Sequence, residues 1–147
     1  MTSATVKWAA ALCACAATPV VADTATPDTA IAAGNWVKVF SLDVERALGR
    51  STRIDTTSVV AGGIGRTFRE AQVMLNASGR YARGSTAFLA RSVDCRGSRV
   101  VTTQWRVIGP TGTVLGTSTG VGTVGRVEWD SEDGKVLRYV CRGILPR

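Results

Sequence analysis

Asp94-Cys95 and Cys141 are the parts of this 147-residue chain around which the rest is organised. They hold the only two cysteines that follow residue 22, and 46 positions separate Cys95 from Cys141. A disulfide between them would hold the C-terminal segment against the end of a strand that closes at Asp94-Cys95. In the chain-entropy model, closing a loop of that size stabilises a fold by about 4 kcal/mol. The pair therefore predicts a small oxidised domain.

The first 22 residues have the three parts of a secretory signal peptide. Lys7 lies in a short basic region, residues 8–17 form an apolar run, and Val20 and Ala22 suit cleavage before Asp23. An apolar run of about ten residues is too short for a helix to cross the hydrocarbon core of a bilayer. We therefore expect export to the periplasm or the cell surface, with no transmembrane segment left in the chain.

The leader allows a second interpretation. Leu12-Cys13-Ala14-Cys15 loosely resembles a lipobox, which would place a lipid anchor on Cys15. We favour the signal peptide, because Cys13 fits the lipobox poorly and the cleavage site that ends at Ala22 is cleaner.

Export decides the chemistry of the two remaining cysteines. In an oxidising compartment, two cysteines pair more often than they bind a metal or attack a substrate. The chain has no histidine, which removes the usual base for a cysteine or serine nucleophile and a common zinc ligand. We expect a Cys95–Cys141 disulfide, no metal or other cofactor, and no enzymatic activity. A carboxylate pair for glycoside hydrolysis stays open, although no residue marks one.

Basic residues outnumber acidic ones after the leader, 17 against 11, and 15 of the 17 are arginine. Because the guanidinium fork binds carboxylate, phosphate and sulfate, a basic exported protein can meet lipopolysaccharide, sulfated glycans or anionic proteins. Scattered arginines also suit an ordinary solvated surface. We predict contacts with a protein or polyanionic partner, not with nucleic acid, at four arginines around one expected strand and its turn: Arg66, Arg69, Arg80 and Arg83.

Alternating apolar residues and glycine-rich turns predict an antiparallel meander. Residues 23–34 lack periodicity and are expected to be a disordered tether to a domain at 35–147. The expected strands are 36–42, 53–59, 66–75, 86–95, 99–108 and 113–119. Residues 43–50 are expected to form a loop, and 70–75 also contain good helix formers, so a helix there stays an alternative.

Residues 99–108 form the clearest strand of the chain. Strict alternation would place Val101, Thr103, Trp105 and Val107 on one face. Each of the three tryptophans in the domain, Trp36, Trp105 and Trp129, is expected to fill the core rather than to receive a ligand.

The last segment has the pattern of a short helix. Asp130 is a suitable N-cap, Gly143 suits the position after the last turn, and Val136 with Val140 starts an apolar face. Gly134 weakens this helix by up to about 1 kcal/mol. A final strand over 135–141 stays an alternative.

Two motifs have simpler explanations than the chemistry they resemble. Gly120-Val121-Gly122-Thr123-Val124-Gly125 matches the dinucleotide fingerprint G-x-G-x-x-G, but the residues after it look extended and no acidic residue follows at the required distance. The acidic residues from Glu128 to Asp133 lack the spacing of an EF-hand, and an acidic first helical turn explains them better.

Several of these features together resemble the surface-adhesin protein E-like family of Gram-negative bacteria. They are a domain that opens at Trp36, the run Ile54-Asp55-Thr56-Thr57-Ser58-Val59 before a glycine turn, Asp94-Cys95, a hairpin turn with Gly112, and a helix-like end at Cys141. The resemblance covers about residues 36–142, and the Asp-Cys pair with the distant cysteine is its most specific part.

The resemblance implies an α+β, mainly β fold, in which an antiparallel sheet of about six strands carries a C-terminal helix tethered by the Cys95–Cys141 disulfide. It also implies a non-enzymatic envelope protein, similar to a dimeric lipoprotein adhesin that binds vitronectin and laminin. A homodimer is therefore an expectation, which the unpaired edges of such a sheet support. A structural or assembly factor of the envelope without a host ligand is the alternative function.

Overall fold

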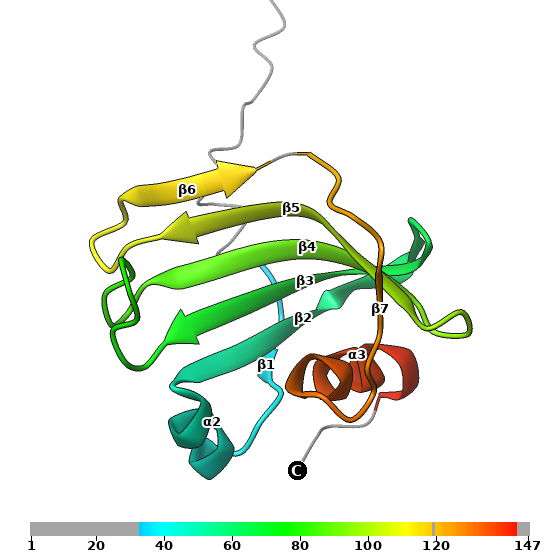
Figure 1. Cartoon of the computed structure of the whole chain (residues 1–147), viewed down its shortest axis with the longest axis horizontal. Helices are drawn as coiled ribbons and strands as arrows, with labels where there is room; N and C mark the ends of the chain where they lie inside the picture. Colours follow the sequence, from blue (N-terminus) through cyan, green and yellow to red (C-terminus); the bar gives the residue numbers. More distant parts are fainter. Residues whose placement is uncertain (1–32, 119, 144–147) are drawn as a thin grey trace, which may run out of the picture.

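The computed structural model describes residues 33–118 and 120–143, which form one antiparallel sheet with two helices beside it (Figure 1). The elements are β1 (Trp36–Lys38), α2 (Leu42–Leu48), β2 (Arg50–Gly62), β3 (Gly65–Met74), β4 (Thr86–Asp94), β5 (Arg99–Ile108), β6 (Val114–Ser118), β7 (Gly125–Arg126) and α3 (Glu132–Arg142). The expected fold class is confirmed, including the C-terminal helix and the disulfide that tethers it.

The main sheet has its strands in chain order, from β1 at one edge to β6 at the other, and the short β7 pairs with β5. Neighbouring strands pair antiparallel throughout, as expected for a meander. The two edges leave β1 and β6 with one strand partner each. A homodimer through such an edge stays a prediction.

Three predicted segments lie outside the described residues. They are the signal peptide at residues 1–22, the alternative lipid anchor at Cys15, and the tether up to residue 32. In the two ranges that the structure does describe, neither helix is long and apolar enough to cross a membrane.

Residues 43–50 were predicted to be a loop, and this prediction is wrong for most of them, because α2 occupies Leu42–Leu48. A tertiary contact holds this short helix. Glu45 is buried and accepts hydrogen bonds from Lys38 Nζ and Ser51 Oγ. Burial alone would raise the pKa of Glu45, but these bonds and the nearby cations outweigh it, and the pKa is lowered. β1 accordingly ends at Lys38, short of the predicted residue 42.

The predicted face of β5 is also wrong, because the strand contains a bulge. Gln104 lies opposite Ala90 and Thr102 lies opposite Arg91, so that Thr103 is an extra residue on β5. Directly opposed residues share a face of the sheet, and the bulge therefore puts Val101 and Trp105 on opposite faces. Trp105 is 36% exposed and does not fill the core as predicted.

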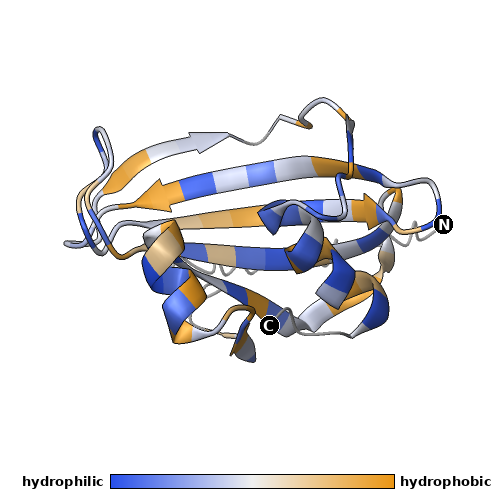
Figure 2. Ribbon diagram, turned by 60° about the horizontal axis from the view of Figure 1, so that its bottom comes forward, coloured by the Kyte–Doolittle hydropathy of each residue, from blue (hydrophilic) through white to orange (hydrophobic). Residues whose placement is uncertain are grey.

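The core lies between one face of the sheet and α3. Figure 2 views the two helices on their side of the sheet and shows that each carries both hydrophobic and hydrophilic residues. Val136, Leu137 and Val140 of α3 are almost completely buried. They pack in one cluster with the sheet residues Ile54, Phe68 and Val93. Burial of one such side chain contributes about 1.5–3 kcal/mol, so the apolar face of α3 alone fixes the helix firmly.

Ion pairs with two arginines of the sheet fix the N-terminal end of α3. Arg91 donates to both carboxylate oxygens of Asp133, at 2.6 and 2.8 Å, and to Glu70 Oε2 at 2.7 Å. Arg50 Nη2 lies 2.7 Å from Glu132 Oε1. These pairs confirm the acidic first turn, and Ser131, one residue after the predicted Asp130, is the N-cap.

Gly134 is a requirement of the packing rather than a weakness of the helix. A Cβ at this position would lie 2.1 Å from the Glu128 carbonyl oxygen and 2.6 Å from Trp129 Cα. The first turn of α3 can therefore approach the preceding segment only because residue 134 has no side chain.

The glycine run before β7 has the simple role that the sequence predicted. Gly122 N donates to the Thr102 carbonyl, and the chain then enters β7 at Gly125. A strand follows these glycines where a dinucleotide fingerprint would open a helix.

Candidate anion-binding site at the disulfide

The disulfide joins the β4–β5 turn to the last turn of α3, at the right-hand end of the sheet in Figure 1. The Cys95 and Cys141 Cα atoms lie 5.8 Å apart, which confirms the predicted pairing. We name this end the disulfide pole. It comprises the turn 94–99, Arg66, Arg126, the segment 128–130 and the last turn of α3 from Arg138.

A carboxylate shapes the β4–β5 turn. Asp94 Oδ1 accepts hydrogen bonds from the backbone nitrogens of Gly97, at 2.8 Å, and Arg96, at 3.2 Å, while Arg99 Nη2 lies 2.8 Å from Oδ2. The bond from Gly97 and the pairing with Arg99 lower the pKa of Asp94. Ser98 has a left-handed backbone, with φ of 52°, and its hydroxyl accepts a bond from Trp129 Nε1 at 3.0 Å.

The C-terminal end of α3 is capped from the sheet. Arg66 Nη1 donates to the carbonyl oxygens of Val140, at 2.8 Å, and Cys141, at 3.3 Å. The carbonyls of a last helical turn carry partial negative charge, which would repel an anion. Arg66 offsets that charge, and Gly143 ends the helix in the left-handed conformation.

A pocket of about 470 Å³ lies beside the disulfide. The residues that line it are Cys95, Ser98, Trp129, Arg138, Cys141 and Arg142. Arg138 Nη2 donates to the Trp129 carbonyl at 3.0 Å, which holds this guanidinium at the wall. The volume falls in the range of small-molecule sites, and the wall combines an indole ring with two cations.

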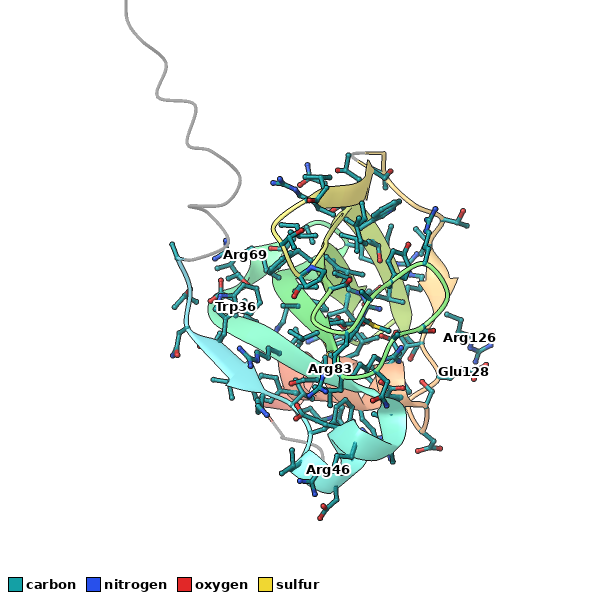
Figure 3. The ribbon with its side chains drawn as sticks, turned by 90° about the vertical axis from the view of Figure 1, so that its left-hand side faces the viewer. Trp36, Arg46, Arg69, Arg83, Arg126 and Glu128 are labelled. Carbon is teal, nitrogen blue, oxygen red and sulfur yellow. A yellow bond between two sulfur atoms is a disulfide. The ribbon has the colours of Figure 1, made fainter. Side chains whose placement is uncertain are left out.

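The disulfide pole carries a surplus of positive charge. Its arginines are Arg66, Arg96, Arg99, Arg126, Arg138 and Arg142, and its carboxylates are Asp94, Glu128 and Asp130. Six cations against three anions leave a surplus of three. Within the described ranges, Arg96, Arg126 and Arg142 pair with no carboxylate, and all three are exposed. Figure 3 shows Arg126 and Glu128 on the side of the molecule away from Trp36 and Arg69.

This chemistry suits binding of an anion. Unpaired guanidinium groups offer planar pairs of donors that match carboxylate, sulfate or phosphate, and they bind more strongly where an apolar wall excludes water. For the residues described, no three of His, Cys, Asp and Glu are grouped in a way that could hold a metal ion. Glu132 and Asp133, which form the acidic first turn of α3, are both paired with arginine.

The structure separates the four arginines that were predicted to form one contact surface. Arg66 is at the disulfide pole. Arg80 and Arg83 lie in the β3–β4 loop, beyond the other end of β3, where Arg80 stacks on Tyr81 at 5.2 Å. Figure 3 faces this end and labels Arg83.

Arg69 lies on the face of the sheet away from α3 and has a structural role. It pairs with the buried Asp55, and its guanidinium carbon lies 5.8 Å from the ring centre of Trp36. Burial alone would raise the pKa of Asp55, but hydrogen bonds from Thr57, Arg69 and Asn35 outweigh it, and the pKa is lowered. This pairing reduces the charge that Arg69 can present to a partner.

The sequence contained a signal for the arginines of the pole that the prediction missed. Each cysteine of the disulfide is followed directly by an arginine, Arg96 after Cys95 and Arg142 after Cys141. Once the two cysteines are assumed to pair, both arginines must lie near the bond. Arg126 has no such signal, because only the pairing of β7 with β5 brings it opposite Arg99.

Comparison of the chain with protein-family models, with curated proteins and with solved structures found no match. The resemblance to the adhesin family therefore stays an expectation from the sequence.

Proposed function

We propose that this protein is a non-enzymatic, exported protein of the bacterial envelope that binds a polyanionic partner at the disulfide pole. The observation that carries the proposal is a pocket lined by Trp129, Arg138 and Arg142, at the end of the sheet that also carries the exposed, unpaired Arg96 and Arg126. Elsewhere in the described chain, Arg50, Arg69 and Arg91 are engaged in ion pairs with carboxylates, whereas Arg80 and Arg83 in the β3–β4 loop are exposed and pair with no carboxylate.

The Cys95–Cys141 disulfide supports export. Disulfides persist in the periplasm and outside the cell, and they are rare in the cytosol. The periplasm and the cell surface both allow disulfides to persist. A protein in either place can meet a polyanion of the envelope or of a host.

A sulfated or phosphorylated glycan is the polyanion that the pole fits best. The pocket has room for one charged group of such a chain, and exposed arginines on the β4–β5 turn and on β7 extend the positive surface beyond it. A linear chain with repeated anionic groups can contact these sites together, whereas a single small anion cannot. The adhesin resemblance points in the same direction, because it implies contact with the extracellular matrix.

Heparin affinity, measured by calorimetry at several salt concentrations, tests this function. We expect binding that weakens steeply with salt, since exposed charges are screened. The triple variant Arg96→Gln, Arg126→Gln, Arg142→Gln should bind at least about tenfold more weakly, because charge-assisted hydrogen bonds contribute about 1.5–3 kcal/mol each when fully formed. Arg83→Gln removes an exposed arginine from the end of the sheet opposite the disulfide pole. It is the control for the loss of affinity that removal of one positive charge causes by itself.

Two outcomes would overturn the proposal. One is an absence of heparin binding at low salt. The other is an equal loss of affinity per charge in Arg83→Gln and in the triple variant, which would show that net charge alone governs binding. Immobilised vitronectin and laminin, tested beside heparin, distinguish the glycan from the protein ligands that the adhesin resemblance implies.

A further inference from the structure

Both halves of the Cys95–Cys141 disulfide line the pocket at the disulfide pole. A disulfide that lines a pocket offers an incoming thiol a route to the sulfur atoms, which a disulfide inside a core does not. Both cysteines are partly exposed, and both pack only at the margin of the main hydrophobic cluster.

The charges around this disulfide favour the ionic form of a thiol. Arg138 and Arg142 line the same pocket, Arg96 follows Cys95 directly, and Arg66 lies against the Cys141 carbonyl. The thiolate is both the attacking and the leaving species in disulfide exchange, and neighbouring cations stabilise it. Of the three carboxylates of the pole, Asp94 pairs with Arg99, Asp130 is fully exposed at 3.5 Å from Arg138, and Glu128 is exposed to solvent and lines no part of the pocket.

The rest of α3 has attachments that do not depend on the disulfide. Arg91 and Arg50 hold its first turn through Asp133 and Glu132, and its apolar face is buried in the core. We therefore expect that opening of the disulfide loosens the last turn, which the hydrogen bonds from Arg66 still tie to the sheet, and leaves the remainder of the helix docked.

We propose that the Cys95–Cys141 disulfide is a site of thiol–disulfide exchange for anionic thiols that enter the arginine-lined pocket. The thiolate sulfur of the entering molecule forms a bond with one cysteine Sγ as the Cys95–Cys141 bond breaks. The other Sγ leaves as a thiolate beside the arginines and takes a proton from water. A second thiolate attacks the mixed disulfide, so that both cysteines are reduced and two molecules of the small thiol are oxidised to their disulfide.

The exchange rates of three small thiols with the full chain test this proposal. The thiols are 2-mercaptoethanesulfonate, which is anionic, 2-mercaptoethanol, which is neutral, and cysteamine, which is cationic. Each is used at the same thiolate concentration, and each rate is divided by the rate of the same thiol with a small neutral disulfide. Acid quenching, alkylation and mass spectrometry count the reduced protein and the mixed disulfide.

We expect the normalised rate of the sulfonate to exceed that of the neutral thiol by about tenfold at low salt, since a charged cleft concentrates an oppositely charged reactant by at least that factor. Cysteamine should be the slowest. Arg142→Gln should remove most of the preference for the anionic thiol, and high salt should do the same. Arg83→Gln, which lies at the other end of the sheet, should keep it.

Equal normalised rates for the three thiols would overturn the proposal, as would a preference for the sulfonate that Arg142→Gln leaves unchanged. This inference shares the arginines of the proposed function, but the two fail separately. Heparin binding without thiol discrimination would refute the exchange site alone. Thiol discrimination without heparin binding would refute the polyanion partner alone.

Discussion

The two ends of α3 are both surrounded by arginine, but the arginines have different roles. At the N-terminal end, Arg50 and Arg91 form ion pairs with carboxylates of the helix and of the sheet. At the C-terminal end, Arg66 caps backbone carbonyls, and Arg142 has no carboxylate partner within the described residues. Arginine therefore fixes the helix at both ends, and at the C-terminal end Arg142 also keeps its charge available.

This contrast shows that pairing, rather than the number of arginines, decides which guanidinium groups keep their charge available. A buried guanidinium between two carboxylates has its charge neutralised, and its burial keeps a ligand away from it. An exposed guanidinium without a carboxylate partner keeps its charge and stays accessible to a ligand. The comparison between the two ends of α3 can be tested by variants that each remove one contact at one end of the helix.

Removal of Arg91 should have the largest effect on stability. Arg91→Met would leave Glu70, which is completely buried, without its cation, and we expect the free energy of unfolding to fall by about 3–5 kcal/mol. Urea unfolding followed by tryptophan fluorescence measures this loss. The pKa of Arg91 supports the assignment: burial alone would lower it, but Asp133 and Glu70 outweigh burial and raise it.

A double variant controls for the change in shape. Arg91→Met with Glu70→Met replaces the pair by apolar groups and should recover part of the lost stability, because no charge then remains buried alone. A single variant Arg91→Met that lost less than about 1 kcal/mol would contradict the view that the N-terminal end of α3 depends on this pair.

Removal of the disulfide should cost less and act locally. For Cys95→Ala with Cys141→Ala, we expect a loss of about 2–4 kcal/mol. Hydrogen exchange should show early loss of protection in the last turn of α3 and retained protection around Val136 and Leu137, which are buried. Equal loss of protection along the whole helix would mean that the two ends are not independently attached.

Much of the fold was predictable, because it rests on local patterns. Alternation in β3 to β6 follows from side chains that face opposite sides of a strand, and the disulfide followed from the number of cysteines in an exported chain. The missed helix α2 depends on buried contacts of Glu45 with Lys38 and Ser51, which its own seven residues do not reveal. The bulge at Thr103 shows up only in the pairing with β4.

The site was harder to predict than the fold. Arg66 and Arg69 are neighbours in the sequence of one strand, but the odd separation places them on opposite faces, and Arg69 is engaged by Asp55 from β2. Which arginines are paired depends on contacts between residues far apart in the chain. The sequence could show only that arginine follows each cysteine of the disulfide.

A side chain at residue 134 should loosen the N-terminal end of α3. Alanine favours helices over glycine, so Gly134→Ala would stabilise an isolated helix. Here its Cβ would meet the backbone of Glu128 and Trp129, and we expect a net loss of about 1–3 kcal/mol. Lys135→Ala, at the next position and exposed, is the control and should change the free energy of unfolding by less than about 0.5 kcal/mol. A stabilised Gly134→Ala variant would show that the close approach is dispensable.

The smallest effect concerns the ion pair at the disulfide pole. The pKa of Asp94 lies below its usual value of 3.8, mainly because Gly97 N–H and then Arg99 stabilise the carboxylate. Since the folded-state pKa is the lower one, this contribution to stability is present above about pH 4 and is lost as the pH falls through the folded-state pKa. In a carboxyl NMR titration, Arg99→Gln should raise the pKa of Asp94 only part of the way, because the bond from Gly97 remains.

A complete return of the Asp94 pKa to its usual value in Arg99→Gln would contradict this ordering. The pKa of Asp94 would then depend on Arg99 alone, and the contrast between the two ends would be weaker. A partial return of the pKa would mean that the hydrogen bonds of the turn keep the Asp94 carboxylate stabilised without Arg99. That arginine, which is 59% exposed, could then leave its pair to meet an anionic ligand at little cost to the fold.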